Sequence, residues 1–248
     1  MINQIFFILF FLYITIILPI VILPLALIQK ILLPNHSDSW GYISKCSLNL
    51  LYLKQQYTSR AKLIDKGYIL ANHRCFLDFS LDPLCTRSSV IGRYKPFLLM
   101  PLLSFLGMLD NRIIAFKRGE TGKDKIMSKI NKHFNKKGLF SQRILFYPEG
   151  TRKKYETLES PEDFKNNHLK FGLLKAIYED KKYPVQIFMS SNKEKVIDEK
   201  KLKLSLNQTI ISKICEPIYP DNFETFDDFI DNICNIWYES YNEIHKIN

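Results

Sequence analysis

The longest hydrophobic segment of the chain lies near its start. Residues 5 to 28 contain only two polar side chains, Tyr13 and Thr15, and no charged one. A helix of this length would extend about 36 Å, enough to cross a hydrocarbon core of about 30 Å. We therefore expect a membrane-inserted helix, with a buried helix of a soluble protein as the alternative. Pro19 and Pro24 each remove a helix hydrogen bond, so a re-entrant or in-plane helix pair is a second alternative to a straight span.

The charges that follow this segment predict its orientation. Lys30 is the first charged side chain, and further Lys and Arg residues follow it, whereas the other flank carries only the α-amino group. Positively charged flanks stay on the cytoplasmic side of a membrane. We therefore expect a membrane anchor over residues 1–39 and a domain over residues 40–248 that faces the cytosol.

Strand-like and helix-like patterns alternate in the rest of the chain. Short apolar runs predict strands at residues 68–71, 113–116, 144–147, 184–189, 202–206 and 209–215. Apolar residues three and four apart predict helices over 123–134, 169–179 and from 226 onward. This alternation predicts an α/β fold, with a mixed, largely parallel sheet flanked by helices behind the N-terminal membrane helix or helix pair. Residues 96–109 are apolar but too short to span, and fit a buried helix, a membrane-surface segment or the wall of an apolar channel.

Polar side chains follow the strand expected at residues 68–71. Asn72 and His73 end it, and Asp78 comes five residues after the histidine. Residues five apart on a helix point ~140° away from each other, so the two side chains meet only if His73 lies in a loop. Asp78 would then fix the imidazole tautomer and leave the other ring nitrogen free as a base. A structural His–Asp pair is the alternative, and the apolar setting of Cys75 favours packing over a nucleophilic role.

A second polar stretch follows the strand expected at residues 144–147. It contains Glu149, Gly150, Thr151 and Arg152, at a place where α/β proteins carry ligand-binding loops. Glycine lets backbone and ligand approach closely, and the arginine offers a planar fork of donors suited to phosphate. A solvated turn is the alternative, and it would explain the glycine and the arginine but not the complete seven-residue stretch from Phe146 to Arg152.

Together and in this order, these stretches resemble the glycerolipid acyltransferase family, which includes the lysophosphatidic acid acyltransferases. The matching residues are Asn72, His73 and Asp78 for its NH-x4-D motif, Phe116-Lys117-Arg118 for its apolar strand with a basic end, Phe146 to Arg152 for its F-PEGTR motif, and Pro184 for its strand-associated proline. The resemblance covers about residues 66 to 190. One departure is that the strand at Tyr183-Pro184-Val185 continues with Gln186-Ile187-Phe188, where the family often has V-P-V-x-x.

The resemblance implies transfer of a fatty acyl group from acyl-CoA or acyl carrier protein to a hydroxyl of lysophosphatidic acid, giving phosphatidic acid. His73, oriented by Asp78, would act as general base without an acyl-enzyme. The residues implied to bind the acceptor phosphate are Lys117, Arg118, Glu149, Gly150, Thr151 and Arg152, with Pro184 in the acyl-donor region. No metal or redox cofactor is implied; the partners are a lysophospholipid, the thioester donor and the bilayer. The alternatives are glycerol 3-phosphate or another lysophospholipid as acceptor, and a non-catalytic protein that binds anionic lipid.

Composition narrows the class of partner. The 248 residues carry 35 Lys+Arg against 25 Asp+Glu, a net charge of +10, and their 46% hydrophobic content excludes wholesale disorder. The five cysteines form no CxxC pair, which argues against a zinc knuckle or a disulfide framework. The basic residues are mostly lysines scattered along the chain rather than gathered in one stripe, so we expect no nucleic-acid partner.

Overall fold

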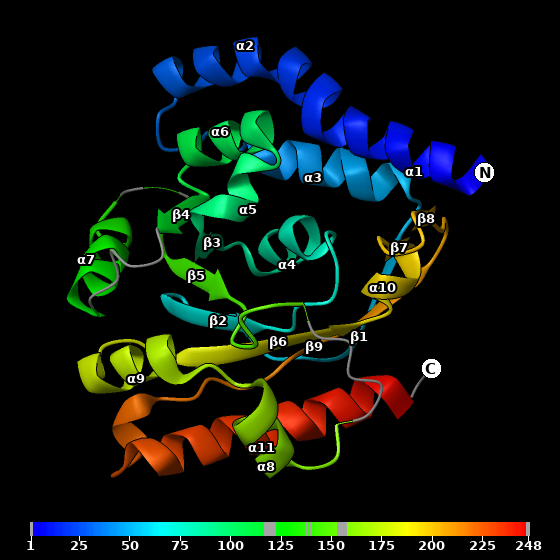
Figure 1. Ribbon diagram of the computed structural model, residues 1–248. Helices are drawn as coiled ribbons and strands as arrows, with labels where there is room; N and C mark the ends of the chain where they lie inside the picture. The colour runs from blue at the N-terminus through cyan, green and yellow to red at the C-terminus, as the bar shows by residue number, and fades with distance from the viewer. Residues whose placement is uncertain (1, 117–122, 137, 139, 153–157, 247–248) are drawn as a thin grey trace.

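A seven-stranded sheet runs through the middle of the molecule (Figure 1). The computed structural model describes residues 2–116, 123–136, 138, 140–152 and 158–246. The strand order is β1-β9-β6-β2-β5-β3-β4, and a separate two-stranded ribbon pairs β7 with β8. The strands are Lys54–Arg60 (β1), Gly67–Ala71 (β2), Ser89–Arg93 (β3), Ile113–Phe116 (β4), Arg143–Phe146 (β5), Val185–Ser191 (β6), Ile197–Asp198 (β7), Lys203–Leu204 (β8) and Thr209–Ile214 (β9). β6 and β9 pair antiparallel and the other neighbours in the sheet pair parallel, which confirms the mixed, largely parallel α/β fold.

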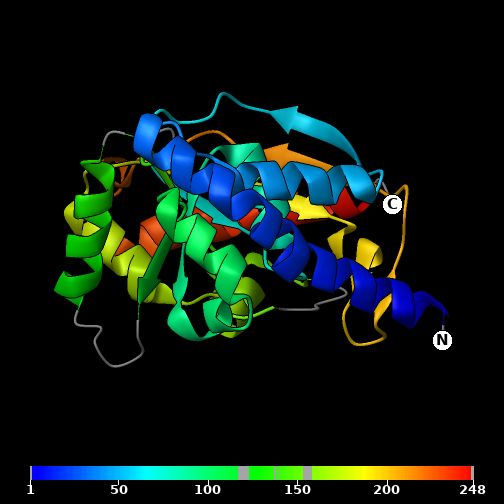
Figure 2. The same cartoon turned by 90° about the horizontal axis from the view of Figure 1, so that it is seen from above.

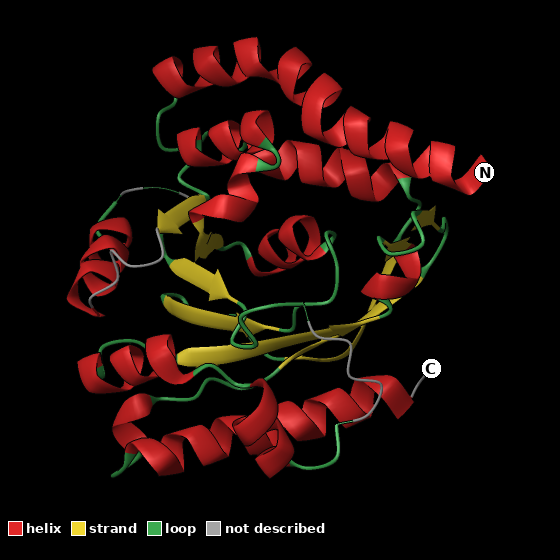
Figure 3. Ribbon diagram, in the orientation of Figure 1, coloured by secondary structure: helices red, strands yellow, loops and turns green. Residues whose placement is uncertain are grey.

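Helices cover both faces of this sheet (Figure 3). α3, α4, α5 and α6 lie on one side of it, and α8, α9 and α11 lie on the other. The α-helices are Ile2–Leu12 (α1), Leu18–Leu32 (α2), Ser39–Leu50 (α3), Asp78–Thr86 (α4), Tyr94–Leu98 (α5), Pro101–Leu109 (α6), Lys123–Phe134 (α7), Pro161–Asp163 (α8), Phe171–Asp180 (α9), Lys193–Val196 (α10) and Phe226–Lys246 (α11). Shorter helical turns are π-helical Tyr13–Ile17 and Phe164–His168 and 3₁₀ Pro220–Asn222.

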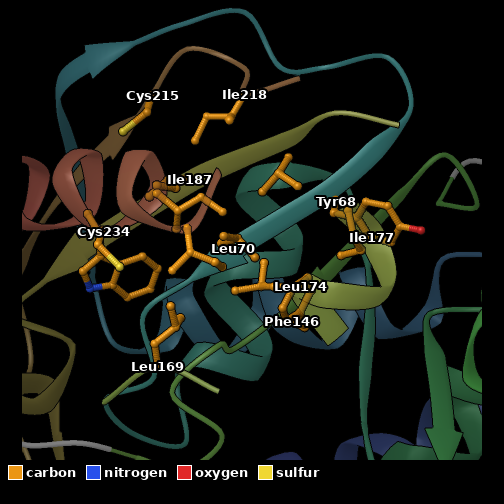
Figure 4. Packing of buried hydrophobic residues seen from close by; sticks show 14 of the residues in the cluster. Tyr68, Leu70, Phe146, Leu169, Leu174, Ile177, Ile187, Cys215, Ile218 and Cys234 are labelled. Atoms are coloured by element: carbon orange, nitrogen blue, oxygen red, sulfur yellow. The ribbon is translucent and has the colours of Figure 1, made fainter. Parts of the chain in front are cut away.

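The main core lies between the sheet and the helices α9 and α11. Figure 4 shows Leu70 of β2, Phe146 of β5 and Ile187 of β6 packed near Leu174 and Ile177 of α9. All five residues of β2 and all seven of β6 are buried. Strands that are covered on both faces read as continuous apolar runs, which is why the sequence predicted them well.

The N-terminal apolar segment forms one helical run over Ile2–Leu32 rather than a helix pair. A π-helical turn joins α1 to α2, and Pro24 lies within α2. The run lies lengthwise over α3 and α6 (Figures 1 and 2) and buries Ile22 and Ala26 against Trp40 and Leu103. Among the described residues it is the one helix long and apolar enough to cross a membrane, and roughly a third of its most apolar part is buried.

The direction of the strands decides which loops can meet. β2, β3, β4, β5 and β6 all run parallel to their neighbours within this set. The segments that follow these five strands therefore emerge at the same edge of the sheet, and the segments that precede them lie at the opposite edge. Ligands bind at the carboxyl edge in open α/β sheets, so a site is expected at the edge where the segments after these five strands emerge.

Candidate active site

His73 and Asp78 meet at the carboxyl edge of the sheet. His73 lies in the loop after β2, and Asp78 is the first residue of α4. The Nδ1 atom of His73 lies 2.6 Å from Oδ2 of Asp78. The same carboxylate oxygen accepts the backbone N–H groups of Arg74 at 2.5 Å and Cys75 at 3.0 Å. Three donors from one tight loop thus converge on Oδ2, so the loop and the carboxylate hold the imidazole in place together.

The carboxyl group of Asp78 is kept in its charged form. Burial acts to raise its pKa, but the Lys193 ammonium and the hydrogen bond with His73 outweigh burial and lower it. An ionised carboxylate can only accept hydrogen bonds, so the proton between the pair belongs to Nδ1 of the imidazole. Nε2 of His73 is then the ring nitrogen that carries a free lone pair, as a general base requires.

The imidazole ring of His73 is held by two aromatic rings. Tyr147, which follows β5, stacks on it with centroids 4.3 Å apart and an angle of 19° between planes. Phe79 of α4 meets it edge-on, with centroids 5.5 Å apart at 80°. His73 retains only 9% of its surface exposed, so its orientation is restricted on several sides.

Two further residues hold the backbone on either side of His73. Glu149 is fully buried, and its Oε2 accepts the backbone N–H of His73 at 2.5 Å. The sequence predicted a place for Glu149 at the acceptor phosphate, whereas the structure turns this carboxylate inward to the histidine loop. Asn72 is also fully buried: its Nδ2 donates to the carbonyl oxygen of Ser190 at 2.8 Å, and its Oδ1 accepts the N–H of Ser190 at 3.0 Å.

His73 lines a cavity of about 510 Å³. Its walls are largely apolar, with Phe79, Ile91, Phe97, Phe116 and Leu173 among the lining residues. A cavity of this size and lining can take a small, largely apolar ligand, because binding sites of about 300–1,000 Å³ with apolar walls take small organic ligands.

Two cations line the same cavity. Arg93 ends β3, and Lys170 precedes α9. Gly150 also lines it, in a left-handed backbone conformation (φ 72°), where an added Cβ atom would lie 3.1 Å from Lys170. The cavity therefore combines a base, apolar walls and two positive charges, which suits an anionic amphiphile.

Two other residues expected at the phosphate, Thr151 and Arg152, lie away from the cavity lining. Arg152 and Thr151 are exposed and are not among the residues that line the cavity. The guanidinium group of Arg152 pairs instead with the carboxylate of Glu199. Lys117 and Arg118 lie outside the described residues.

Pro184 lies at the opposite edge of the sheet from His73. It precedes β6, and its carbonyl oxygen accepts the backbone N–H of Tyr68 at the start of β2. His73 follows the far end of β2, six residues beyond Gly67, which corresponds to about 20 Å of extended strand. The structure therefore does not bring Pro184 next to His73, and its place in the acyl-donor region stays a prediction.

Sequence reasoning also missed three charged residues of this region: Arg93, Asp82 and Lys193. Asp82 lies one turn after Asp78 on α4, and Lys193 comes two residues after the end of β6. The available signal was their position, because Arg93 and Lys193 follow parallel strands and so emerge at the same edge as His73.

Comparison with models of protein families finds no match, and comparison with curated protein sequences finds none either. Among solved structures, the chain is similar to the crystal structure of the 1-acyl-sn-glycerophosphate (LPA) acyltransferase PlsC from Thermotoga maritima. The TM-score is 0.69, and the alignment covers 100% of this chain and 98% of that chain at 14% sequence identity. At that identity the likeness concerns the fold: the chain has, over its whole length, the fold of this acyltransferase.

Proposed function

We propose that the protein is a membrane-associated acyltransferase that moves a fatty acyl group from a thioester donor to a hydroxyl of lysophosphatidic acid, giving phosphatidic acid. The observation that carries the proposal is the 2.6 Å contact between His73 and Asp78 on the wall of a largely apolar cavity. The ordered motifs in the sequence support it, as does the shared fold with an LPA acyltransferase.

The chemistry follows from the tautomer of His73. Asp78 accepts the Nδ1 hydrogen, so Nε2 takes the proton of the acceptor hydroxyl as the oxygen attacks the thioester carbonyl carbon. A C–O bond forms, the C–S bond breaks, and the departing thiolate takes the proton back from the imidazolium. General base catalysis of this kind contributes about 10²–10⁴-fold.

The nearest thiol does not fit a covalent route. Cys75 is buried, and burial raises the pKa of its thiol well above the ordinary value. Its Sγ donates to the carbonyl oxygen of Lys193 at 3.3 Å. Because the thiolate is the reactive form of cysteine, this side chain is unsuited to carry an acyl group, and direct transfer is the simpler scheme.

Arg93 and Lys170 are the residues we assign to the acceptor phosphate. Both line the cavity that contains His73, whereas Arg152 pairs with Glu199. An arginine fork can bind two phosphate oxygens at once, so Arg93 is expected to contribute more than Lys170. Acyl-CoA and acyl carrier protein both remain donors to be tested.

The apolar helix is the element we assign to the membrane. Its outer face exposes large apolar side chains, among them Val21, Leu25 and Ile31. Leu98 and Leu99, next to the cavity wall formed by α5, are exposed as well. Insertion of this surface into a bilayer would bury it and bring lipid to the cavity, with the lysine-rich domain on the cytosolic side.

A transfer assay tests the proposal. Membranes containing the wild-type chain, His73→Ala or His36→Ala are given labelled acyl-CoA or acyl carrier protein with lysophosphatidic acid, glycerol 3-phosphate or lysophosphatidylcholine. His36 is exposed and serves as the matched control. We expect transfer to lysophosphatidic acid, unchanged in His36→Ala and reduced by about 10²–10⁴-fold in His73→Ala.

Three results would count against it. Equal transfer by wild type and His73→Ala would remove the proposed base. Transfer confined to another acceptor would keep the chemistry and change the substrate. Absence of transfer, together with binding to anionic vesicles, would favour a non-catalytic lipid-binding protein.

A further inference from the structure

A fully buried lysine lies behind the His73–Asp78 pair. Lys193 is the first residue of α10, and none of its side-chain surface is exposed. Its Nζ lies 2.8 Å from Oδ1 of Asp78, 3.0 and 3.1 Å from the two carboxylate oxygens of Asp82, and 3.0 Å from the carbonyl oxygen of Asn72. Burying an ammonium group is unfavourable unless charges and hydrogen bonds compensate it, and here four oxygens surround it.

We propose that Lys193 is a positioning residue of the acyl-transfer site, which keeps Asp78 charged and aligned with Nδ1 of His73. The effect of Lys193 on the reaction rests on the proposed function, whereas its effect on the placement of the imidazole rests only on the contacts described above. It assigns to Lys193 an effect on the proton chemistry of the pair, beyond its part in folding.

The two oxygens of Asp78 have separate partners. Oδ2 receives the imidazole and two backbone N–H groups, while Oδ1 faces Lys193. Because each oxygen faces a different partner, rotation of the carboxylate about its Cβ–Cγ bond is restrained. Loss of the ammonium would free Oδ1 and remove the charge that favours the ionised form.

Lys193 contacts a second carboxylate, that of Asp82, in addition to that of Asp78. Asp82 is fully buried one helical turn after Asp78. Burial raises the pKa of Asp82 even though Lys193 acts to lower it, and the charge of Asp78 adds to the rise. The ammonium therefore compensates two close carboxylates, and of these Asp78 is the one that also contacts the imidazole.

Other titratable groups surround the pair and stay unchanged in the comparison below. They are the Cys75 thiol, Arg74, Tyr147 and Glu149 after β5, and Arg93 and Lys170 across the cavity. A difference in rate between two variants that differ only at Lys193 therefore reports on the Lys193 side chain.

The test compares Asp82→Asn with the double variant Asp82→Asn/Lys193→Met. Lys193→Met alone would leave two buried carboxylates without a cation and is expected to fold poorly. The double variant removes one charge of each sign, so it keeps the net charge of the wild type. Lys195→Met is the matched control, because Lys195 is exposed on the same short helix.

We expect kcat of the double variant to fall at least tenfold below that of Asp82→Asn, with KM within twofold. The acidic limb of its pH–rate profile should move to higher pH, because the variant loses a positive charge next to the pair. Lys195→Met should leave both quantities unchanged. Equal kcat and equal pH limbs in Asp82→Asn and the double variant would overturn the proposal.

An NMR measurement separates this inference from the proposed function. In chain labelled with ¹⁵N-histidine, the His73 signal, assigned with His73→Ala, should report the Nδ1–H tautomer in Asp82→Asn and a reduced share of it in the double variant. An unchanged tautomer would overturn the positioning role even if the enzyme proved active. If the wild type transfers no acyl group, the proposed function fails, and the tautomer still decides the role of Lys193.

Discussion

The side chain of Asn72 takes the place of a strand residue at the end of β2. β2 ends at Ala71, whereas β6 continues to Ser191, so the backbone groups of Ser190 extend past the parallel pairing. The amide of Asn72 supplies both missing partners, donating to the carbonyl oxygen of Ser190 at 2.8 Å and accepting its N–H at 3.0 Å. We predict that Asn72→Ala destabilises the protein and displaces the histidine loop.

The magnitude follows from what the substitution leaves unpaired. Ser190 and Asn72 are both fully buried, so water cannot readily replace the lost amide. Each unsatisfied buried group costs about 1–3 kcal/mol, which gives about 2–6 kcal/mol for the two groups of Ser190. For a domain of this size, one kcal/mol lowers the melting temperature by about 2–4 °C. We therefore expect a decrease of roughly 4–24 °C in Asn72→Ala.

Thermal unfolding of the detergent-solubilised chain, followed by tryptophan fluorescence, measures this decrease. Asn49→Ala is the matched control, because Asn49 is exposed on α3 and its removal should change the stability by no more than about 0.5 kcal/mol. The acyl-transfer rate of Asn72→Ala at a temperature where it remains folded should also fall, since His73 is the next residue. Equal melting temperatures for Asn72→Ala and Asn49→Ala would refute the reasoning.

Three further predictions concern the rest of the fold. Burial lowers the pKa of His133 to about 4, so the unfolded chain binds a proton at this residue more strongly than the folded chain does. The free energy of unfolding should therefore decrease by about 3 kcal/mol as the pH falls from about 6.5 to about 4. Melting curves at several pH values should show this loss in the wild type and a smaller one in His133→Gln. Trp237→Ala removes a fully buried ring that stacks on Phe164 with centroids 4.7 Å apart, and denaturant titration should show a loss of about 3–5 kcal/mol. Gly107→Ala would place a Cβ atom 2.4 Å from the ring of Trp40, and its melting temperature should fall with a cost of about 1–3 kcal/mol.

Elements of the central sheet could be predicted from the sequence because burial on both faces produces continuous apolar runs. β2, β4, β5, β6 and β9 begin and end within two residues of the expected positions, and α7 and α11 follow their helical periodicity. β1 was missed because it is a polar edge strand, Lys54–Arg60, with most of its side chains exposed and β9 as its neighbour. β3 was missed because its five residues contain only two large apolar side chains.

The candidate site was predictable only where its residues are close in sequence. A loop over residues 72–78 could place His73 beside Asp78 because five residues suffice to turn the chain back. Lys193 stands 115 residues after Asp78, in a lysine-rich stretch that is typical of a solvated surface. Its burial depends on which strand lies next to β2, and that neighbour follows from long-range pairing rather than from local composition.

The direction of the strands explains why Pro184 lies far from His73 and why Lys193 and Arg93 lie near it. In a parallel set, residues that precede a strand and residues that follow it lie at opposite edges of the sheet. Pro184 precedes β6 and Lys193 follows it, so the parallel pairing of β6 with β2 places only Lys193 near His73. The same rule places Arg93 near His73, because Arg93 is the last residue of β3 and β3 runs parallel to β5 and β2. The rule does not apply to β9, because β9 runs antiparallel to β6 and the residues that follow it therefore lie at the opposite edge of the sheet. No feature of the apolar sequence of β9 indicates this reversed direction.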